Sequence, residues 1–520
     1  MSQEFTECTN PATGEVLGQS PLNTAEDVRL AVLNARAAQA KWAEFSVRTR
    51  AKAMRRVRDY LVEHADELAE TISKDNGKVR LDALATEVLP AAFATAYYAR
   101  QASHFLGTKR PWPSHLLFAN KTSQIRRVPW GVVAIVSPWN YPFTIPFSEI
   151  VMALMAGNGV VLKVASQTQM VGRAMERAFE AANMPKGLFS YVNLPGRIAG
   201  DALLEAQVDK LFFTGSVGVG KELMEKAAKT LTPVSLELGG NDPMLVCPDA
   251  HIERAASGAL WAGYSNAGQS CGAVERVYVH ADVYQSFVNT LAEKVRALRT
   301  GPDTDYEVDM GAMTTTSQME TVRRHIDDAV ERGATIYAQA ELPEGLEGNF
   351  LPAVLLTDVD HSMAVMKEET FGPVVAVMKV DDMDAAIRLA NDSNLGLTAS
   401  VWSRNSRNAK KLARQLQAGA VTINDHLMSH GLPETPWGGF KNSGIGRTHA
   451  HVGFDEMTQP QVIINDLLGW LPRNLWWHPY SKELYDGIRA MLIGLQGKGI
   501  ATRLAALRHT TKILTRILPR

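Results

Sequence analysis

Cysteine is rare in this chain of 520 residues, which contains only Cys8, Cys247 and Cys271. Three widely spaced cysteines form neither a disulfide framework nor a zinc site, and so few of them are typical of a reducing compartment. The start, MSQEFTECTN, lacks the apolar segment that a signal peptide needs. We therefore expect a cytoplasmic protein without disulfides or a bound metal.

Net charge and long hydrophobic runs are also lacking. The 54 basic and 55 acidic residues give a net charge of -1, so no overall field attracts nucleic acid. The most apolar long run, FTIPFSEIVMALMAGNGVVLK, contains Glu149, Pro146 and two glycines flanking Asn158. It is predicted to be a buried helix, a turn and a strand, not a membrane span. No repeat of solenoid period is present, and the length predicts two or three domains.

The order of predicted elements indicates an α/β fold. Residues Thr24 to Asp75 have an N-cap threonine, a helical apolar period and a stop at Asn76-Gly77. From about Arg126, short apolar runs that end in Gly, Pro, Ser or Asn alternate with helical segments, and a second such series follows Leu238. This alternation predicts parallel sheets with ligands at the carboxyl ends of the strands. The polar run SQIRRVPWG interrupts the first series as a candidate strand.

The stretch NAGQSCGA places Cys271 among small and polar residues. A catalytic cysteine needs access and a positive or hydrogen-bonding environment, because the thiolate is the nucleophile. Gly268 and Gly272 permit close approach of a substrate, and backbone N–H groups near the cysteine could hold an oxyanion. A buried structural cysteine fits this stretch equally well.

Four other motifs carry candidate functional residues. Glu237 in SLELGGND has apolar neighbours that raise a carboxyl pKa towards that of a general base, and a strand-end salt bridge is the alternative. Asn140 in SPWNYP follows an apolar strand and is either an oxyanion donor or a turn residue. Lys163 ends the buried strand of VVLKVASQT, and Ser216 in FTGSVGVGK opens a helix whose N–H groups attract phosphate. That turn is not G-x-G-x-x-G, so the ordinary dinucleotide fingerprint fails.

Taken together and in order, these motifs resemble those of the aldehyde dehydrogenase superfamily over roughly Asn10 to Gln461. The motifs are SPWNYP, LKVASQT, FTGS, LELGGND, GQSC, EETFGPV and PWGGFKNSGIGR. The resemblance implies a Rossmann-type NAD(P)-binding domain (residues 1–115 and 131–238), an α/β catalytic domain (239–435) and a β-hairpin arm (116–130 and 436–466). The arm, around Gln124 to Arg127 and after Asp455, implies a homodimer or homotetramer.

The resemblance also implies the chemistry and its residues. Cys271 would attack the aldehyde to give a thiohemiacetal, Asn140 and the Cys271 N–H would hold the oxyanion, and Glu237 would activate water to release the acid. The presence of Glu237 disfavours transfer of the acyl group to coenzyme A. Lys163 and Ser166 would bind the adenosine ribose, Ser216 the pyrophosphate, and Glu369 the nicotinamide ribose with Phe371 packed close by. The other expected cofactor-binding residues are Ser137, Trp139, Gly196, Gly200, Thr214, Gly215, Gly220 and Leu238.

Ser166 bears on the choice of cofactor. Relatives that prefer NAD usually carry glutamate three residues after the lysine, and this chain has Ser166 there. A carboxylate repels a 2′-phosphate and a serine does not, while Lys163 is near enough to attract one. We therefore predict that NADP is accepted, and the preference between NADP and NAD is left open because neighbouring residues also contribute.

The tail, residues 467–520, lies beyond the family motifs. After Pro460 nine basic and three acidic residues give +6. Leu504, Leu507, Leu514, Ile517 and Leu518 share one face of a helical wheel, and Arg508, Lys512, Arg516 and Arg520 lie mostly opposite. With Trp470, Trp476, Trp477 and Tyr480 upstream, this pattern predicts peripheral contact with the inner face of an anionic membrane, and packing on the enzyme or another subunit is the alternative.

The substrate is the least defined part of the prediction. Four large apolar residues have two interpretations: Phe143, Phe147, Trp261 and Tyr264. If they line the site, they favour an apolar aldehyde, either aliphatic, including long chains, or aromatic. If they do not, they are core residues. A semialdehyde dehydrogenase of a small polar substrate, a coenzyme A-dependent acylating enzyme and an inactive membrane-associated scaffold are the competing functions.

Overall fold

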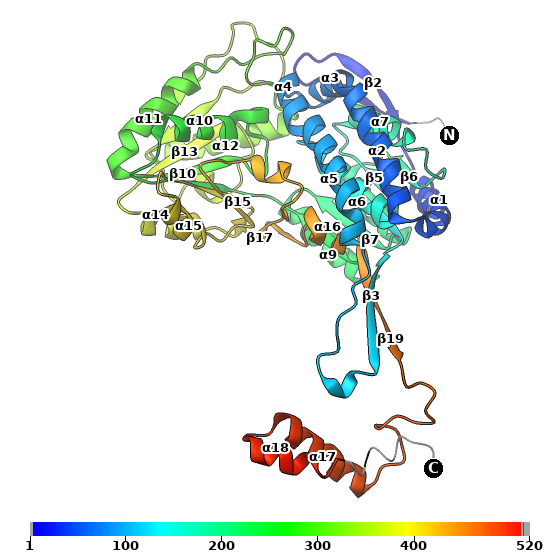
Figure 1. Ribbon diagram of the computed structural model, residues 1–520. Helices are drawn as coiled ribbons and strands as arrows, with labels where there is room; N and C mark the ends of the chain where they lie inside the picture. Colours follow the sequence, from blue (N-terminus) through cyan, green and yellow to red (C-terminus); the bar gives the residue numbers. More distant parts are fainter. Residues whose placement is uncertain (1–3, 511–512, 514–520) are drawn as a thin grey trace. The chain divides into compact units, whose positions relative to one another are not determined.

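The structure is a computed structural model, which describes residues 4–510 and residue 513. The chain forms two compact units, and the ribbon of each is drawn in Figure 1. The large unit comprises Met1–Gly107 and Arg127–Gln459, and the small unit comprises Thr108–Arg126 and Pro460–Arg520.

The amino-terminal helices begin and end where the sequence predicts. Thr24 caps α1 (Ala25–Glu44) by accepting a hydrogen bond from the Asp27 N–H, and Gly77, with φ of 100°, ends α3 in the left-handed conformation that glycine adopts readily. The other elements of this part are β1 (Phe5–Thr9), β2 (Val16–Pro21), α2 (Val47–Glu63), α3 (Ala65–Asn76), α4 (Arg80–Ala83), the π-helical η1 (Leu84–Val88) and α5 (Leu89–Phe105).

A six-stranded sheet follows, in the order β18-β8-β7-β4-β5-β6. All its neighbours are parallel except β18, which runs antiparallel to β8. Its strands and helices are β4 (Val132–Val136), α6 (Thr144–Ala156), β5 (Gly159–Lys163), α7 (Gln169–Glu180), β6 (Phe189–Val192), α8 (Gly196–Glu205), β7 (Lys210–Thr214), α9 (Val217–Ala228), β8 (Val234–Glu237) and β18 (Gly444–Ile445). The apolar run that could have been mistaken for a membrane span is α6, a turn and β5, as predicted.

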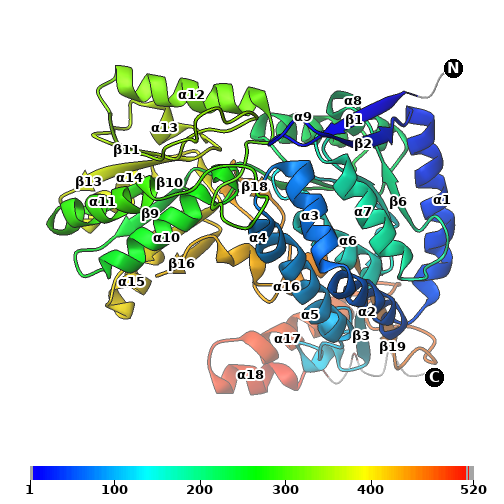
Figure 2. The same ribbon diagram turned by 90° about the horizontal axis from the view of Figure 1, so that it is seen from above.

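Both faces of this sheet are covered, which explains why its central strand β4 is apolar at every position. Val132 and Ala134 of β4 pack into a cluster with residues of α1, α8 and α9. Val133 and Ile135, which point the other way, join a cluster formed with α2, α5, α6 and α7. Figure 2 shows these helices from above.

A seven-stranded sheet forms the second core, in the order β11-β12-β13-β10-β9-β15-β16, with only β11 antiparallel to its neighbour. Its strands are β9 (Asp242–Val246), β10 (Val274–His280), β11 (Thr335–Gln339), β12 (Val354–Thr357), β13 (Val374–Val380), β15 (Thr398–Trp402) and β16 (Ala420–Ile423). The surrounding elements are α10 (Ile252–Tyr264), η3 (Ser265–Gly268), α11 (Ala281–Arg296), α12 (Thr316–Glu331), α13 (Ala364–Lys367), α14 (Met383–Asn391), β14 (Leu395–Gly396), α15 (Ser406–Ala413), η4 (Met428–Gly431) and β17 (Phe440–Lys441). Helix α16 (Ala450–Glu456) packs instead on α5 and α6 of the first core.

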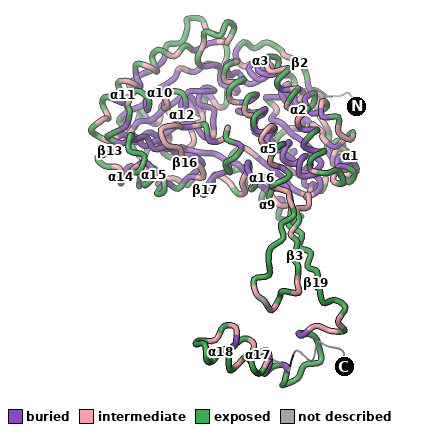
Figure 3. Tube along the Cα trace, in the orientation of Figure 1, coloured by how far each residue is buried: buried purple, intermediate pink, exposed green. Residues whose placement is uncertain are grey.

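The polar run SQIRRVPWG is a strand, as predicted: β3 (Lys121–Pro129) pairs with β19 (Thr458–Asp466). The small unit also contains η2 (Leu116–Phe118), α17 (Lys482–Gln496) and α18 (Ile500–Leu507). Its core is small, formed by Leu475, Leu484 and Ile513, and most of its residues are exposed (Figure 3).

The predicted tail helix is described only in part. In α18 both Leu504 and Leu507 are exposed, and no residue of this helix is buried. Leu514, Ile517, Leu518, Lys512, Arg516 and Arg520 lie outside the described residues. Over the part of the chain that the structure describes, every helix is too short or too polar to cross a bilayer.

Candidate active site

Four candidate residues lie at the same edge of the six-stranded sheet. Lys163, Thr214 and Glu237 are the last residues of β5, β7 and β8, and Ser137 directly follows β4. Parallel strands bring their carboxyl ends to one edge. The strand order reverses between β4 and β7, because β5 and β6 lie on one side of β4 and β7 and β8 on the other, and such sheets bind ligands at this point. Trp139 and Asn140 lie in the connection from β4 to α6.

Cys271 lies in the tight segment between η3 and β10. Asn266, Ala267 and Gly268 all have positive φ there, between 52° and 71°, and a Cβ at Gly268 would collide with the Gly372 carbonyl. This close packing holds the segment against the turn before β13. Cys271 is partly exposed, whereas Cys8 and Cys247 are buried, so the structural-cysteine interpretation fits the other two cysteines better than Cys271.

Two cavities meet at Cys271. The first is small, with a volume of about 20 Å³, and its polar lining includes Glu149, Glu237, His430 and His449. The second is much larger, about 1070 Å³, and opens between α10, η1 and η4 with a mainly apolar wall. Cys271 and His430 line both cavities. The sulfur is therefore reached from a wide apolar space on one side and faces a small acidic space on the other.

Trp261 and Tyr264 line the larger cavity, but Phe143 and Phe147 do not. Both phenylalanines are fully buried in the core, where their rings stack at 5.0 Å and Phe147 continues onto Phe179. The substrate-lining interpretation of these two residues was therefore wrong, because α6 is buried on all sides and turns them away from the cavity.

Carboxyl groups dominate the electrostatics of the site. Burial raises the pKa of the Cys271 thiol, and Glu369, Asp242 and Glu237 raise it further. A positive or hydrogen-bonding environment is expected for a catalytic cysteine. Among the described residues, the interaction that lowers the pKa of Cys271 is a backbone hydrogen bond and not a cation. The pKa of Glu237 is raised well above its usual range by burial and by Glu149, as its apolar neighbours predict. Its Oε2 has no hydrogen-bond partner in the described part of the chain, which argues against the salt-bridge alternative.

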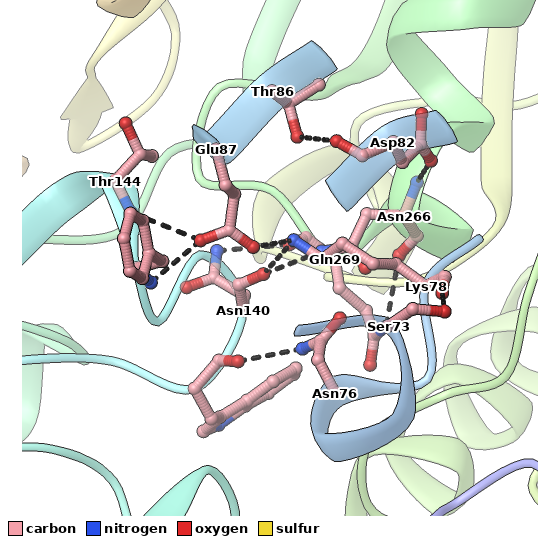
Figure 4. Close-up of polar contacts among 12 residues, drawn as sticks. Ser73, Asn76, Lys78, Asp82, Thr86, Glu87, Asn140, Thr144, Asn266 and Gln269 are labelled. Atoms are coloured by element: carbon pink, nitrogen blue, oxygen red, sulfur yellow. Dashed lines mark hydrogen bonds and ion pairs between the residues drawn. The ribbon is translucent and has the colours of Figure 1, made fainter. Parts of the chain in front are cut away.

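Asn140 is held by a buried network that the sequence did not reveal (Figure 4). Its Nδ2 donates to the Gln269 carbonyl oxygen at 3.0 Å, and its own carbonyl oxygen accepts from Lys78 Nζ at 2.8 Å and Asn266 Nδ2 at 2.9 Å. Lys78 and Glu87 form a fully buried ion pair at 2.6 Å.

The same ion pair also fixes the start of α6. Glu87 Oε2 accepts from the backbone N–H of Phe143 at 2.7 Å and of Thr144 at 3.2 Å. A carboxylate on a helix N-terminus is favourable because the unpaired N–H groups point at it. In the sequence, Lys78 and Glu87 look like ordinary surface charges. The only signal for Lys78 is its position directly after the Asn76-Gly77 helix stop.

The expected cofactor residues line the edge of the sheet in different ways. Lys163 is buried and burial lowers its pKa to about 8, and Ser166 lies three residues on, partly exposed. Gly196 begins α8 beside Lys163. Ser216 caps α9, its hydroxyl accepting from the Val219 N–H.

The remaining glycines of this group serve helix packing in the structure. A Cβ at Gly200 would collide with Leu223, one at Gly215 with Phe213, and one at Gly220 would lie 2.6 Å from Leu238. Within the turn FTGSVGVG, close packing against apolar side chains thus accounts for Gly215 and Gly220, whereas a Cβ at Gly218 would meet open space.

Glu369 and Phe371 approach the site from the seven-stranded sheet. Glu369 Oε1 accepts from the Gly240 N–H at 2.8 Å, and the rings of Phe371 and Trp139 meet edge to face at 5.3 Å. Phe371 has a strained φ of 52°. Buried Glu275, which the sequence reasoning missed, holds this turn by accepting from the N–H groups of Thr370 and Phe371.

Known proteins resemble this chain over most of its length. Residues 1–463 match the profile described as aldehyde dehydrogenase family. A 4,4'-diapolycopene aldehyde oxidase of a Methylomonas species is 38% identical, over 94% of this chain and 91% of that protein. A putative succinate-semialdehyde dehydrogenase [NADP(+)] of Mycolicibacterium smegmatis is also 38% identical, over 87% of each chain.

Solved structures agree with this assignment. Betaine aldehyde dehydrogenase from Staphylococcus aureus, in complex with NAD+, superimposes with a TM-score of 0.86 at 31% identity, covering 92% of this chain and 94% of that one. An NADP-dependent enzyme of E. coli superimposes with a TM-score of 0.85 at 33% identity, covering 89% and 95%. The fold predicted from the motifs is therefore confirmed. The chain belongs to the aldehyde dehydrogenase family.

Proposed function

We propose that the protein oxidises an apolar aldehyde to the carboxylic acid, with NAD(P)+ as the hydride acceptor and Cys271 as the nucleophile. The observation that carries the proposal is the position of Cys271 on the wall shared by the two cavities. An aldehyde that enters the large cavity reaches the sulfur of Cys271. Glu237 lines the small cavity, which also reaches Cys271.

The proposed steps use three residues of this chain. Cys271 Sγ bonds to the aldehyde carbon while the thiol proton passes to water in the large cavity. The carbonyl oxygen takes the electrons of the C=O π bond, and this oxyanion accepts hydrogen bonds from Asn140 Nδ2 and the Cys271 N–H. Asn140 Nδ2 donates one of its two hydrogens to the Gln269 carbonyl oxygen, and the other hydrogen can be donated to the oxyanion. After hydride loss the thioester is attacked by water, whose proton passes to Glu237. The C–S bond breaks and releases the acid.

The residues at the sheet edge fit a nicotinamide dinucleotide, which when bound accepts the hydride. Lys163 is a buried ammonium that forms no ion pair in the described part of the chain, and an uncompensated buried cation is costly unless a ligand uses it. Thr214 Oγ1 is likewise buried without a partner there. We expect Lys163 and Ser166 to bind the adenosine ribose, with Glu369 on the nicotinamide ribose.

The wall of the large cavity favours an apolar substrate over a small semialdehyde acid. A carboxylate substrate needs a cation, and the cavity contains Lys294 and Arg299. Lys294 is paired with Glu253 at 2.6 Å and Arg299 with Asp309 at 2.8 Å. The relative named as a diapolycopene aldehyde oxidase supports the same choice. Its match spans 94% of this chain. Because the tail, residues 467–520, makes up about a tenth of the chain, the match includes part of the tail.

Assays with a series of aldehydes test this function. We expect the full-length protein to form one NAD(P)H per aldehyde without coenzyme A, with kcat/KM rising as an aliphatic chain lengthens into the apolar cavity. NADP should be used at least as well as NAD, because Ser166 presents no carboxylate to a 2′-phosphate. The measurement is initial NAD(P)H formation with aliphatic and aromatic aldehydes and both cofactors.

Three outcomes contradict separate parts of this prediction. A requirement for coenzyme A rules out hydrolysis by Glu237, and a preference for succinic semialdehyde rules out the apolar substrate. A hundredfold preference for NAD, about 2.7 kcal/mol, refutes the argument from Ser166.

The paired strands β3 and β19 support assembly into a homodimer or homotetramer. Val462, Ile463 and Ile464 of β19 are all exposed, and a two-stranded sheet with apolar exposed residues has free edges that readily pair with another chain. We propose that this two-stranded sheet, whose strands come from distant parts of the chain and do not form a hairpin, is the oligomerisation arm.

Charge separates the two units and supports contact of the small unit with an anionic membrane. Residues 108–126 and 460–520 contain 13 basic and 3 acidic residues, a net charge of +10 against -1 for the whole chain. Trp112, Trp470 and Trp477 in this unit are 94%, 72% and 58% exposed. Basic residues with exposed tryptophans are typical of interfacial binding.

Liposome sedimentation tests this contact. The variant W470S/W477S is expected to lose most of its binding to vesicles that contain phosphatidylserine, because the interfacial anchors are gone, and to oxidise a short soluble aldehyde at the normal rate. Phe45→Ser, which alters an exposed aromatic residue of the large unit, is the matched control. Equal vesicle binding by W470S/W477S and Phe45→Ser would end the membrane proposal. So would equal binding of the unaltered protein to neutral vesicles and to vesicles that contain phosphatidylserine.

A further inference from the structure

Glu275 is a buried acid on β10, the strand that follows Cys271, and is 4% exposed. In the described part of the chain its carboxyl forms no ion pair. Arg276, the next residue, is also buried, but its guanidinium donates to the Asn241 carbonyl oxygen at 2.9 Å and 2.7 Å, and successive residues of a strand point to opposite faces. A carboxylate that is buried without a cation is costly, and valine would fit this strand at no such cost. The position therefore indicates a function.

The Glu275 carboxyl binds two consecutive backbone N–H groups in the turn between α13 and β13. Its Oε2 accepts from the Thr370 N–H at 2.9 Å and its Oε1 accepts from the Phe371 N–H at 2.8 Å. Phe371 has a φ of 52°, a conformation that costs energy in a residue with a Cβ and that persists only where the surrounding contacts impose it. Glu275 supplies such contacts with both of its oxygens.

The other side chains that hold this turn bind its carbonyl oxygens. Gln318 Nε2 donates to the Thr370 carbonyl oxygen at 2.9 Å, and Asn241 Nδ2 donates to the Glu368 carbonyl oxygen at 3.0 Å. Among the described residues, Glu275 alone accepts from the two N–H groups. Replacing it therefore removes a restraint that no other described residue duplicates.

The turn presents two expected cofactor residues. Glu369 Oε1 accepts from the Gly240 N–H at 2.8 Å, and the ring of Phe371 meets that of Trp139 at 5.3 Å. Burial raises the pKa of Glu369, and the charge of Glu275 raises it further. An acid at position 275 is thus electrostatically unfavourable for Glu369 as well as for itself. What Glu275 contributes is therefore the position of the turn and not its charge.

The residues expected to bind the adenosine half of the cofactor are independent of this turn. Lys163 ends β5 of the six-stranded sheet, and Ser166 follows it. In the described part of the chain no hydrogen bond joins either residue to Glu275 or to residues 368–371. A change at Glu275 should therefore affect one half of a bound dinucleotide and leave the other half as it is.

We propose that Glu275 is a positioning residue for the nicotinamide half of NAD(P), acting through the turn that carries Glu369 and Phe371. The inference rests on the proposed function, in which Glu369 binds the nicotinamide ribose. While Glu275 holds the turn, both residues are in place before the cofactor binds, so no binding free energy is used to order them. Without this restraint the cofactor must order the turn itself, which weakens binding and slows hydride transfer by misorienting the reacting groups.

The variant E275Q tests the positioning role. Glutamine keeps the length of the side chain but has one acceptor oxygen, so its amide group faces one of the two N–H groups and that contact is lost. We expect the Kd for NADPH and for NADH to rise roughly 10-fold, the scale of one buried N–H left without a partner, and the rate of the NAD(P)H burst to fall. The Kd for ADP, which has the adenosine and pyrophosphate but no nicotinamide ribose, should be unchanged. Fluorescence measures binding of the reduced cofactors, and titration calorimetry measures binding of ADP.

D249N is the matched control, because it makes the same carboxyl-to-amide change at a distant N–H contact. Asp249 Oδ2 accepts from the Asn405 N–H at 3.0 Å. It follows β9, whereas the turn precedes β13, so the two lie at opposite ends of these parallel strands. D249N should bind NADPH, NADH and ADP as the unaltered protein does. A second measurement needs no variant: without cofactor, the amides of Thr370 and Phe371 should exchange slowly with deuterated water, since both are hydrogen-bonded.

Equal weakening of ADP and NADPH binding in E275Q would assign Glu275 a general packing role and overturn the proposal. Unchanged NADPH binding and burst rate would overturn it too. Should E275Q not fold, rapid amide exchange at Thr370 and Phe371 in the unaltered protein would decide against a held turn, and slow exchange would support it. An unaltered protein that binds both reduced cofactors but oxidises no aldehyde would instead contradict the proposed function, and the binding comparison would still test the role of Glu275.

Discussion

Replacing Cys271 by alanine is expected to lower kcat for every aldehyde by about 10⁴-fold or more, the scale of loss found when an enzyme loses its nucleophile. The large cavity and the residues at the sheet edge are unchanged by this substitution, so cofactor binding should persist. No thiohemiacetal forms without the sulfur, and no hydride donor is then created. The measurement is NAD(P)H formation at saturating aldehyde, with cofactor binding followed by fluorescence.

Cys247→Ala is the matched control for Cys271→Ala. Cys247 directly follows β9 and is buried. Removal of its sulfur should leave kcat close to normal. If Cys271→Ala oxidised aldehydes as fast as the control, the proposed mechanism would be wrong at its first step.

Glu237→Gln is expected to separate the two halves of the reaction. Acylation should still give one NAD(P)H per active site, and kcat should then fall by 10²- to 10⁴-fold, the usual contribution of a general base. Glutamine has the shape of the protonated acid but cannot accept a proton from water. Rapid-mixing absorbance at the nicotinamide band measures the burst and the slow phase.

The pH dependence provides a further check on Glu237. A base works only when ionised, so hydrolysis should rise with pH through the pKa of Glu237 and fail below it. Since burial and Glu149 raise that pKa, the acid limb of the unaltered protein should lie above the ordinary range of glutamate. Hydroxylamine, which cleaves thioesters directly, should restore turnover of Glu237→Gln. Loss of the burst together with steady-state activity would show that Glu237 acts before hydride transfer instead.

Local patterns were sufficient for the fold. Thr24 and Gly77 mark helix ends because capping depends only on neighbouring residues, and the run from Phe143 to Lys163 is a helix, a turn and a strand because glycine and asparagine interrupt it. The order of motifs, through its resemblance to the aldehyde dehydrogenase superfamily, predicted one site for Cys271, Glu237 and Asn140.

Long-range packing was needed for the rest. Lys78 and Glu87 look like ordinary charges in the sequence, and only the structure shows that they form a buried ion pair that holds Asn140. Glu149 is an acid in an apolar run of the sequence, and only the structure shows that it lines the small cavity at Cys271. Phe143 and Phe147 follow the site motif in the sequence, but α6 is enclosed on every side and turns them into the core. The environment of Cys271 is acidic because Asp242 and Glu369 reach it from distant segments.

The sequence by itself determined the family and the alternation of helices and strands, and it predicted the reactive groups, because each of these depends on short motifs and their order. Only the tertiary structure decided which charged residues are buried, which aromatic residues line the large cavity, and that Glu149 lines the small cavity together with Glu237. Those properties depend on the distance between residues that are far apart in the chain, and no local pattern encodes that distance.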